Sequence, residues 1–225
     1  MDIRIDTPVG HIAAEHPAAT RVFHRFGIDF CCGGGKPLRE ACEARDVDPD
    51  TVLSAIREEL RDGKTDETCW VSADLNSLID HILTAYHKPL NEELVRLDEM
   101  TKKVASVHHE KDERLTELRS LFVGLKAELG AHMMKEEQIL FPMIRQGQGE
   151  SAGGPISVME HEHDSAGEAL RKIRALTDEF QAPEEACNTW RAMLHGLEAM
   201  ERELHLHIHL ENNILFPRAL EHATA

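Results

Sequence analysis

This sequence has few of the residues that build sheets or many short strands. Aromatic residues make up 4% of the chain, and its 14 glycines and 9 prolines cluster between long stretches rich in Ala, Leu, Glu, Met and Arg. This composition favours helices over strands. The apolar content of 41% supports a packed core, so a disordered chain is not expected.

Basic residues, long apolar runs and paired cysteines are also scarce. The 25 Lys and Arg stand against 41 Asp and Glu, a net charge of −16, and no basic stripe is present, so we expect no nucleic-acid partner. No apolar run approaches the roughly 20 residues of a membrane span, and the N-terminus lacks a signal region, so we expect no membrane partner. Five cysteines without disulfide-framework spacing indicate a reducing, cytoplasmic location.

A polar stretch near Gly63 divides the chain. Before it, Pro17, Pro37 and Pro49 suit the first turns of short helices, and Gly27 suits a helix end. After it come four long periodic stretches, roughly residues 74–105, 111–146, 156–180 and 184–221, with Gly/Pro-rich loops at 147–154 and 182–183. The fold class is therefore predicted as all-α. We expect a small helical domain over 1–63, a linker over 64–72 and an antiparallel four-helix bundle over 73–225.

One motif occurs twice in the predicted bundle. The pattern H-x-x-x-E-x-x-I-L-F-P covers residues 132–142 and again 207–217. Each copy has a further histidine upstream, His87 before the first and His163 before the second, with nearly equal spacing. The symmetry indicates two related helical hairpins, each supplying one histidine from its first helix and a histidine and a glutamate from its second.

Helical periodicity places these polar residues on the apolar stripes of their helices. The set comprises His87, His132, Glu136, His163, His207 and Glu211. A carboxylate buried without a partner would cost several kcal/mol, a penalty that metal coordination removes. The alternative is a set of core histidines hydrogen-bonded to the glutamates. The duplication, with its matched upstream histidines, favours a metal site.

The other histidines of the bundle fall elsewhere on the pattern. His81, His161, His205 and His209 lie off the stripes, and His108-His109 falls in a predicted loop. We expect these side chains to be solvated or to contact a metal ligand rather than the metal. His161 is the nearest competitor of His163, and it would face away from the bundle axis.

The donor set indicates iron. Four imidazoles and two carboxylates, without thiolate, do not suit a closed tetrahedral zinc site, and the zinc-protease motif is absent. If both glutamates bridge, each of two metal ions receives two histidine nitrogens and two glutamate oxygens. An ion that prefers about six donors then keeps about two open positions for bridging oxygen, water, O2, NO or peroxide.

At these residues the sequence resembles the hemerythrin-like family, whose four-helix bundles hold two irons. It is most similar to the RIC family of di-iron proteins, which repair iron–sulfur clusters after nitrosative or oxidative damage. The motifs that carry this resemblance are residues 132–142, Gly154-Pro-Ile-Ser-Val-Met159, residues 210–217 and Gly27-Ile-Asp-Phe-Cys-Cys-Gly-Gly-Gly-Lys36. The resemblance implies a hemerythrin-like bundle behind a small cysteine-pair domain. It also implies two oxo- and carboxylate-bridged irons held by the six residues above, with Glu136 and Glu211 bridging, and damaged iron–sulfur proteins as partners; a homodimer is left open.

Cys31-Cys32, followed by three glycines, differs from the isolated Cys42, Cys69 and Cys187, which fit inert packing. Its loop is flexible, and its backbone can approach a partner closely. Nearby Lys36 and Arg25 would lower a thiol pKa. The pair could serve metal transfer, thiol redox chemistry or contact with a client protein, or be a glycine turn that happens to follow two cysteines.

Three functions are consistent with these features. The first is iron–sulfur repair, in which the bundle donates iron or handles reactive nitrogen species and the cysteines assist delivery. The second is a di-iron NO reductase or peroxidase that uses the open coordination positions. The third is a sensor module that binds O2 or NO reversibly.

Overall fold

The computed structural model describes residues 3–61 and 70–221, and within these ranges the secondary structure is helical. The described residues contain no strand, only an isolated β-bridge between Pro8 and Pro37. The all-α prediction is therefore confirmed. None of the described helices is long and apolar enough to cross a membrane.

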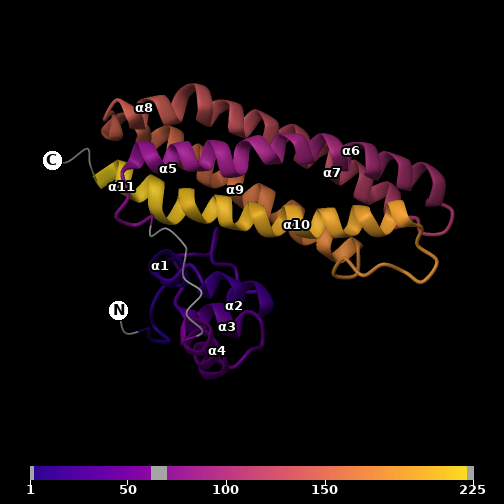
Figure 1. Cartoon of the computed structure of the whole chain (residues 1–225), viewed down its shortest axis with the longest axis horizontal. Helices are drawn as coiled ribbons and strands as arrows, with labels where there is room; N and C mark the ends of the chain where they lie inside the picture. Colours follow the sequence, from indigo (N-terminus) through magenta and orange to yellow (C-terminus); the bar gives the residue numbers. More distant parts are fainter. Residues whose placement is uncertain (1–2, 62–69, 222–225) are drawn as a thin grey trace. The chain divides into compact units, whose positions relative to one another are not determined.

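Four short helices come first, in the segment that the sequence predicts to contain short helices (Figure 1). Their bounds are α1 Val9–Glu15, α2 Ala19–Arg25, α3 Leu38–Glu43 and α4 Pro49–Arg61. Gly27 adopts a φ of 65° just after α2, a left-handed conformation that ends a helix and suits glycine. Most of the predicted linker, with Gly63 and Cys69, lies outside the described residues, so the division into domains at residues 63 and 73 stays a prediction.

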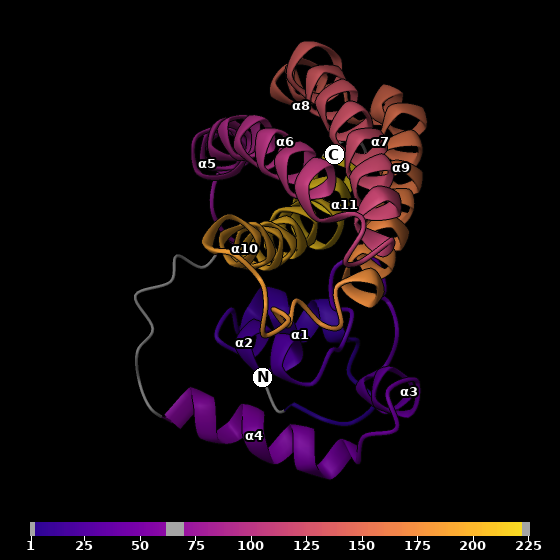
Figure 2. The ribbon, with the colours of Figure 1, turned by 90° about the vertical axis from the view of Figure 1, so that its right-hand side faces the viewer.

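Four long helical segments follow, and three of them are interrupted by a π-turn. The first comprises α5 Leu75–His81, η1 Ile82–His87 and α6 Lys88–His108, and the second α7 Arg114–Lys135, η2 Glu136–Leu140 and α8 Phe141–Arg145. The third is α9 Gly149–Leu176, and the fourth comprises α10 Asn188–Leu210, η3 Glu211–Leu215 and α11 Phe216–Glu221. Figure 2 shows α6 beside α7, in agreement with the contacts between these helices.

The third long helix differs from the prediction at both ends. It begins at Gly149, inside the predicted loop, and contains Pro155. Ala152 and Ile156 are buried, so packing overrides the low helix propensity of the glycines there. The helix ends at Leu176 rather than near residue 180, because the three residues from Asp178 to Phe180 all have positive φ.

Backbone contacts divide the chain into two compact units, whose boundaries fall within α5, α8, α9 and α10. One unit is Met1–Asp80 with Ile144–Gly153 and His205–Ala225; the other is His81–Met143 with Gly154–Leu204. In the first, α1 to α4 enclose a core that includes Phe23, Leu38 and Ile56, and Leu206 packs against it. In the second, a core of leucines, methionines, Phe122 and Trp190 joins the helices.

Candidate metal centre

Each π-turn begins or ends at a candidate ligand. The turn η1 ends at His87, η2 begins at Glu136 and η3 begins at Glu211. A π-turn carries one residue more than an α-turn, and such turns are frequent at functional sites. Residues on both sides of the extra residue can therefore face the core. In the second motif copy, Ile214, Leu215 and Phe216 are all buried although they are consecutive.

Glu136 lies between two of the candidate histidines. Its Oε2 atom is 3.4 Å from Nε2 of His87 and 3.3 Å from Nε2 of His132. The Glu136 side chain is fully buried, and the two imidazoles are almost so. His163 completes this part of the site, since its Nε2 atom is 3.0 Å from Nε2 of His132. Four of the six predicted residues therefore point their ligand atoms at one place.

Two glutamates orient the imidazoles from outside. Nδ1 of His87 is 2.9 Å from Oε1 of Glu137, and Nδ1 of His132 is 3.0 Å from Oε2 of Glu162. A carboxylate only accepts hydrogen bonds, so each Nδ1 carries the proton and each neutral ring presents the lone pair of Nε2. Burial opposes ionisation of Glu162, but hydrogen bonds from Lys135 and His132 outweigh it and lower the pKa of Glu162.

This arrangement of donors fits a bound cation. The lone pairs of His87 Nε2 and His132 Nε2 face a carboxylate, and neither oxygen of Glu136 accepts a hydrogen bond. A buried carboxylate without hydrogen bonds is costly. A single proton on Glu136 could be donated to only one of the two imidazoles, and His132 also faces His163 through the same nitrogen. One cation accepts the lone pairs of nitrogen and oxygen together.

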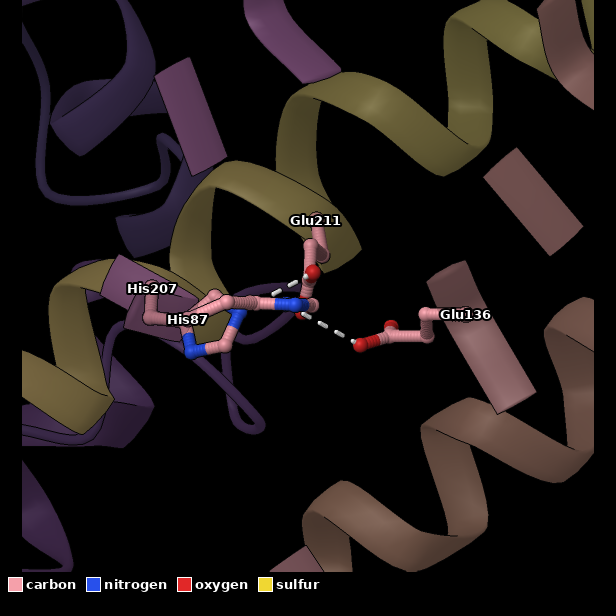
Figure 3. Close-up of side chains that lie close together, drawn as sticks. All are labelled: His87, Glu136, His207 and Glu211. Carbon is pink, nitrogen blue, oxygen red and sulfur yellow. Dashed lines mark hydrogen bonds and ion pairs between the residues drawn. The ribbon is translucent and has the colours of Figure 1, made fainter. Parts of the chain in front are cut away.

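The second motif copy repeats the pairing of histidine and glutamate. Nε2 of His207 is 3.1 Å from Oε1 of Glu211, one helical turn along the chain, and both side chains are buried. Figure 3 shows these two residues with His87 and Glu136, their polar ends pointing toward one another.

The six predicted residues form two overlapping groups that could each hold a metal ion. One group is His87, Glu136, His207 and Glu211, and the other is His132, Glu136, His163 and Glu211. Within each group the ligand atoms lie within 4.8 Å of one another. Both glutamates belong to both groups.

The cysteine pair forms a separate cluster with Asp29. Asp29, Cys31 and Cys32 each offer one ligand atom, and these three atoms lie within 4.8 Å of one another. Neither cysteine is in a disulfide. The expectation of a lowered thiol pKa is wrong for Cys31. A hydrogen bond with Cys32, burial and the charge of Asp29 raise the pKa of Cys31 well above its ordinary value.

Asn213 attaches the cysteine loop to η3, a role that the sequence did not suggest. Its Nδ2 atom donates to the carbonyl oxygens of Phe30 and Cys31, each at 3.2 Å. A Cβ atom on Gly10 or on Gly34 would lie 2.2 Å from Oδ1 of Asn213, so both positions need glycine for this close approach. The one available signal was the contrast between Asn213 and Gln138, its counterpart in the first copy.

Two other histidines differ from expectation. His209 is buried against the Phe30 ring, and burial lowers the pKa of His209 to about 4. It was expected to be solvated or to contact a ligand. His108 is the last residue of α6 rather than a loop residue, and it packs on Trp190 with Nε2 3.3 Å from Sγ of Cys187. His161 is exposed, as predicted.

Comparisons with known proteins give matches in both the N-terminal part and the long-helix part of the chain. The model of the family described as the hemerythrin HHE cation binding domain matches residues 78–219, and a domain of unknown function, DUF542, matches residues 5–60. Relatives named iron-sulfur cluster repair protein YtfE occur in Dickeya chrysanthemi, at 44% identity, and in Pectobacterium atrosepticum and Escherichia coli O81, at 45%. Each alignment covers 96% of this chain and 97% of the relative.

Proposed function

Because this chain belongs to the hemerythrin-like family of iron–sulfur cluster repair proteins, we propose that it repairs iron–sulfur clusters damaged by nitrosative or oxidative stress. Its bundle would hold two irons, bridged by Glu136, Glu211 and an oxo group. It would donate iron, or handle NO or peroxide, near the damaged cluster. Its partners would be damaged iron–sulfur proteins in a reducing cytoplasm, and the cysteine-pair domain would assist delivery.

The observation that carries this proposal is the pair of four-residue groups that share both glutamates. Each group offers two nitrogens and two oxygens, a set that suits iron. Two such ions bring four positive charges, and the two buried carboxylates would offset half of them.

The surrounding side chains contribute orientation. Glu137 and Glu162 accept the Nδ1 protons of His87 and His132 and so hold Nε2 of each ring toward Glu136. Partners of this kind fix the tautomer of a ligand and raise its basicity. Two irons bound here would supply redox chemistry and open positions for small ligands.

Recovery of a damaged enzyme tests the proposal. An iron–sulfur enzyme is inactivated with NO or peroxide, and the iron-loaded chain is added under reducing conditions. We expect activity to return faster than with an equal amount of free iron, and the Glu136→Gln variant to lose this advantage. Recovery no greater than that given by free iron would overturn the repair function.

A second candidate, reduction of NO or peroxide at the two irons, is favoured by the count of protein donors. Each group supplies four, so an ion that prefers about six keeps positions for a small ligand. Formation of N2O from NO over many turnovers with a reductant would support this activity. A single stoichiometric burst, or reversible binding without product, would indicate a scavenger or a sensor instead.

A further inference from the structure

The loop from Asp29 to Gly33 carries a second cluster of metal-ligating atoms, apart from the ligands of the bundle. Asp29, Cys31 and Cys32 each contribute one atom to a group spanning no more than 4.8 Å. The Sγ atoms of the two cysteines are 3.8 Å apart. The cluster thus combines two sulfurs and a carboxylate at the separations of a shared ligand.

The distance between the sulfurs matches coordination to one ion. Two metal–sulfur bonds of about 2.3 Å at a tetrahedral angle place the sulfurs about 3.8 Å apart. A disulfide bond would bring them to about 2.05 Å. Two hydrogen-bonded thiols would also lie at the observed distance, so the sulfurs alone do not decide between a thiol pair and a metal site.

The carboxylate of Asp29 favours a metal site over a thiol pair, because it adds a third ligand atom beside the two sulfurs. Its Oδ1 atom accepts hydrogen bonds from the backbone N–H groups of Cys31, Cys32 and Gly33, at 3.0 to 3.2 Å, and from the Cys31 thiol at 3.4 Å. Four donors therefore surround one oxygen of Asp29 and hold the carboxylate beside the two sulfurs.

The loop holds these atoms in place before any ligand arrives. A Cβ atom on Gly33 would lie 2.9 Å from the carbonyl oxygen of Asp29, so the tight fold of the loop requires glycine at this position. Asn213 fixes the carbonyl groups of Phe30 and Cys31 from the other side. Preorganised ligands lose little conformational entropy on binding, which favours affinity.

Part of the cluster is accessible to solvent. Cys31 is buried, whereas Cys32 and Asp29 are half-buried. Three protein ligands leave one position of a tetrahedral ion open for water or for a ligand from another molecule, as in sites where a metal reacts or is exchanged. A closed structural site would use a fourth protein ligand.

We propose that Asp29, Cys31 and Cys32 form a second metal site, which takes one thiophilic divalent cation such as Fe2+ or Zn2+ through two thiolates and a carboxylate. Binding exchanges two thiol protons for the cation, so that two protons leave for each ion bound and no electron is transferred. That the cation is iron in transit to or from a cluster rests on the proposed function. The existence of the site does not.

Cadmium titration of the full, iron-loaded chain tests this site. Thiolate coordination of Cd2+ gives an ultraviolet charge-transfer band, which the His/Glu ligands of the bundle cannot produce. We expect the band to saturate at about one Cd2+ per chain with release of about two protons. Cys32→Ser should abolish it, and this half-buried position accepts serine without disturbing the core.

A variant of Asp29 tests whether this residue binds the metal or only shapes the turn, and a variant of a distant cysteine serves as its control. Asp29→Asn keeps the Oδ1 acceptor of the loop but removes the charge and the second oxygen, so we expect affinity to fall by at least roughly tenfold. Cys187→Ser, at an exposed cysteine outside the loop, should leave the band unchanged. A band that persists in Cys32→Ser, or undiminished affinity in Asp29→Asn, would overturn the proposal. A chain that binds Cd2+ here but fails to restore a damaged cluster would overturn only the repair function.

Discussion

The two copies of the H-x-x-x-E-x-x-I-L-F-P motif have the same ligand types but different surroundings. In the first copy, Glu137, Gln138 and Ile139, the three residues after Glu136, are exposed. In the second copy, Asn213 takes the position of Gln138, is half-buried and binds the backbone of the cysteine loop. The repeated residues thus provide the metal chemistry, and the variable position after them decides whether the π-turn is solvated or attached to another part of the chain.

The copies also differ one residue earlier. Glu137 of the first copy is a carboxylate and accepts from Nδ1 of His87. The same position in the second copy is Asn212, a neutral amide. A carboxylate raises the basicity of a ligating imidazole more than a neutral acceptor does. The two halves of the site therefore differ in charge outside the ligands although their ligand sets match.

Removal of a shared glutamate should have the largest effect. Glu136→Gln and Glu211→Gln each alter both four-residue groups, whereas His132→Ala alters one. We expect iron content to fall from about two per chain to well below one in both glutamine variants, and to about one in His132→Ala. Metal analysis and the visible spectrum of the purified chain measure this. A glutamine variant that retains both irons would contradict the bridging role.

Removal of the outer carboxylate should have a smaller effect. Glu137→Gln replaces the partner of His87 with a neutral amide, and we expect iron affinity to fall about 10- to 100-fold. Gln138→Ala, at an exposed site in the same turn, is the matched control and should leave affinity unchanged. Competition with a chelator gives the affinities. Equal affinities in the two variants would show that Glu137 does not tune the ligand.

Asn213→Ala should lower the free energy of unfolding, whatever its effect on iron affinity. It leaves the carbonyl groups of Phe30 and Cys31 without their amide donor, at a cost of about 1–3 kcal/mol in the free energy of unfolding. The counterpart Gln138→Ala should cost less than about 0.5 kcal/mol. Chemical denaturation of the loaded chain measures both. Equal stability of the two variants would rule out the attachment that distinguishes the copies.

Gly34→Ala tests the same attachment from the other side. The added Cβ would lie 2.2 Å from Oδ1 of Asn213, so the variant must displace that side chain. We expect its destabilisation to shrink when Asn213 is already alanine, because the clash has gone. Gly35→Ala, where a Cβ atom would have open space, is the control. Additive effects of Gly34→Ala and Asn213→Ala would contradict direct contact.

The smallest effect concerns Asp98, which lies outside both copies. Hydrogen bonds from Lys126 and Arg119 lower the pKa of Asp98. A lowered pKa stabilises the folded chain above the ordinary pKa of about 4, and this contribution is lost as the pH falls through the folded value. Asp98→Asn should therefore cost less than about 1 kcal/mol at neutral pH and nothing in acid. A loss of stability that does not depend on pH would show that the packing of Asp98, and not its charge, is responsible.

Most of the fold and the grouping of the candidate ligands follow from local patterns. Helical stripes and the repeated motif placed six residues of the core together, because each rule concerns neighbours one or two turns away. Local patterns did not predict the start of α9, since the burial of Ala152 depends on tertiary packing. The partners of Asn213 did not follow either, because Phe30 and Cys31 lie about 180 residues earlier in the chain.

The three π-turns have a consequence for comparing chains of this family. Each is equivalent to an α-helix with one inserted residue, which rotates everything downstream by about 100°. A relative that forms an uninterrupted α-helix after Glu136 should therefore align with a single-residue gap within residues 137–140. Such a gap in an alignment would mark a change in helix register, with Leu140 and Phe141 turned to new neighbours, rather than a lost surface residue.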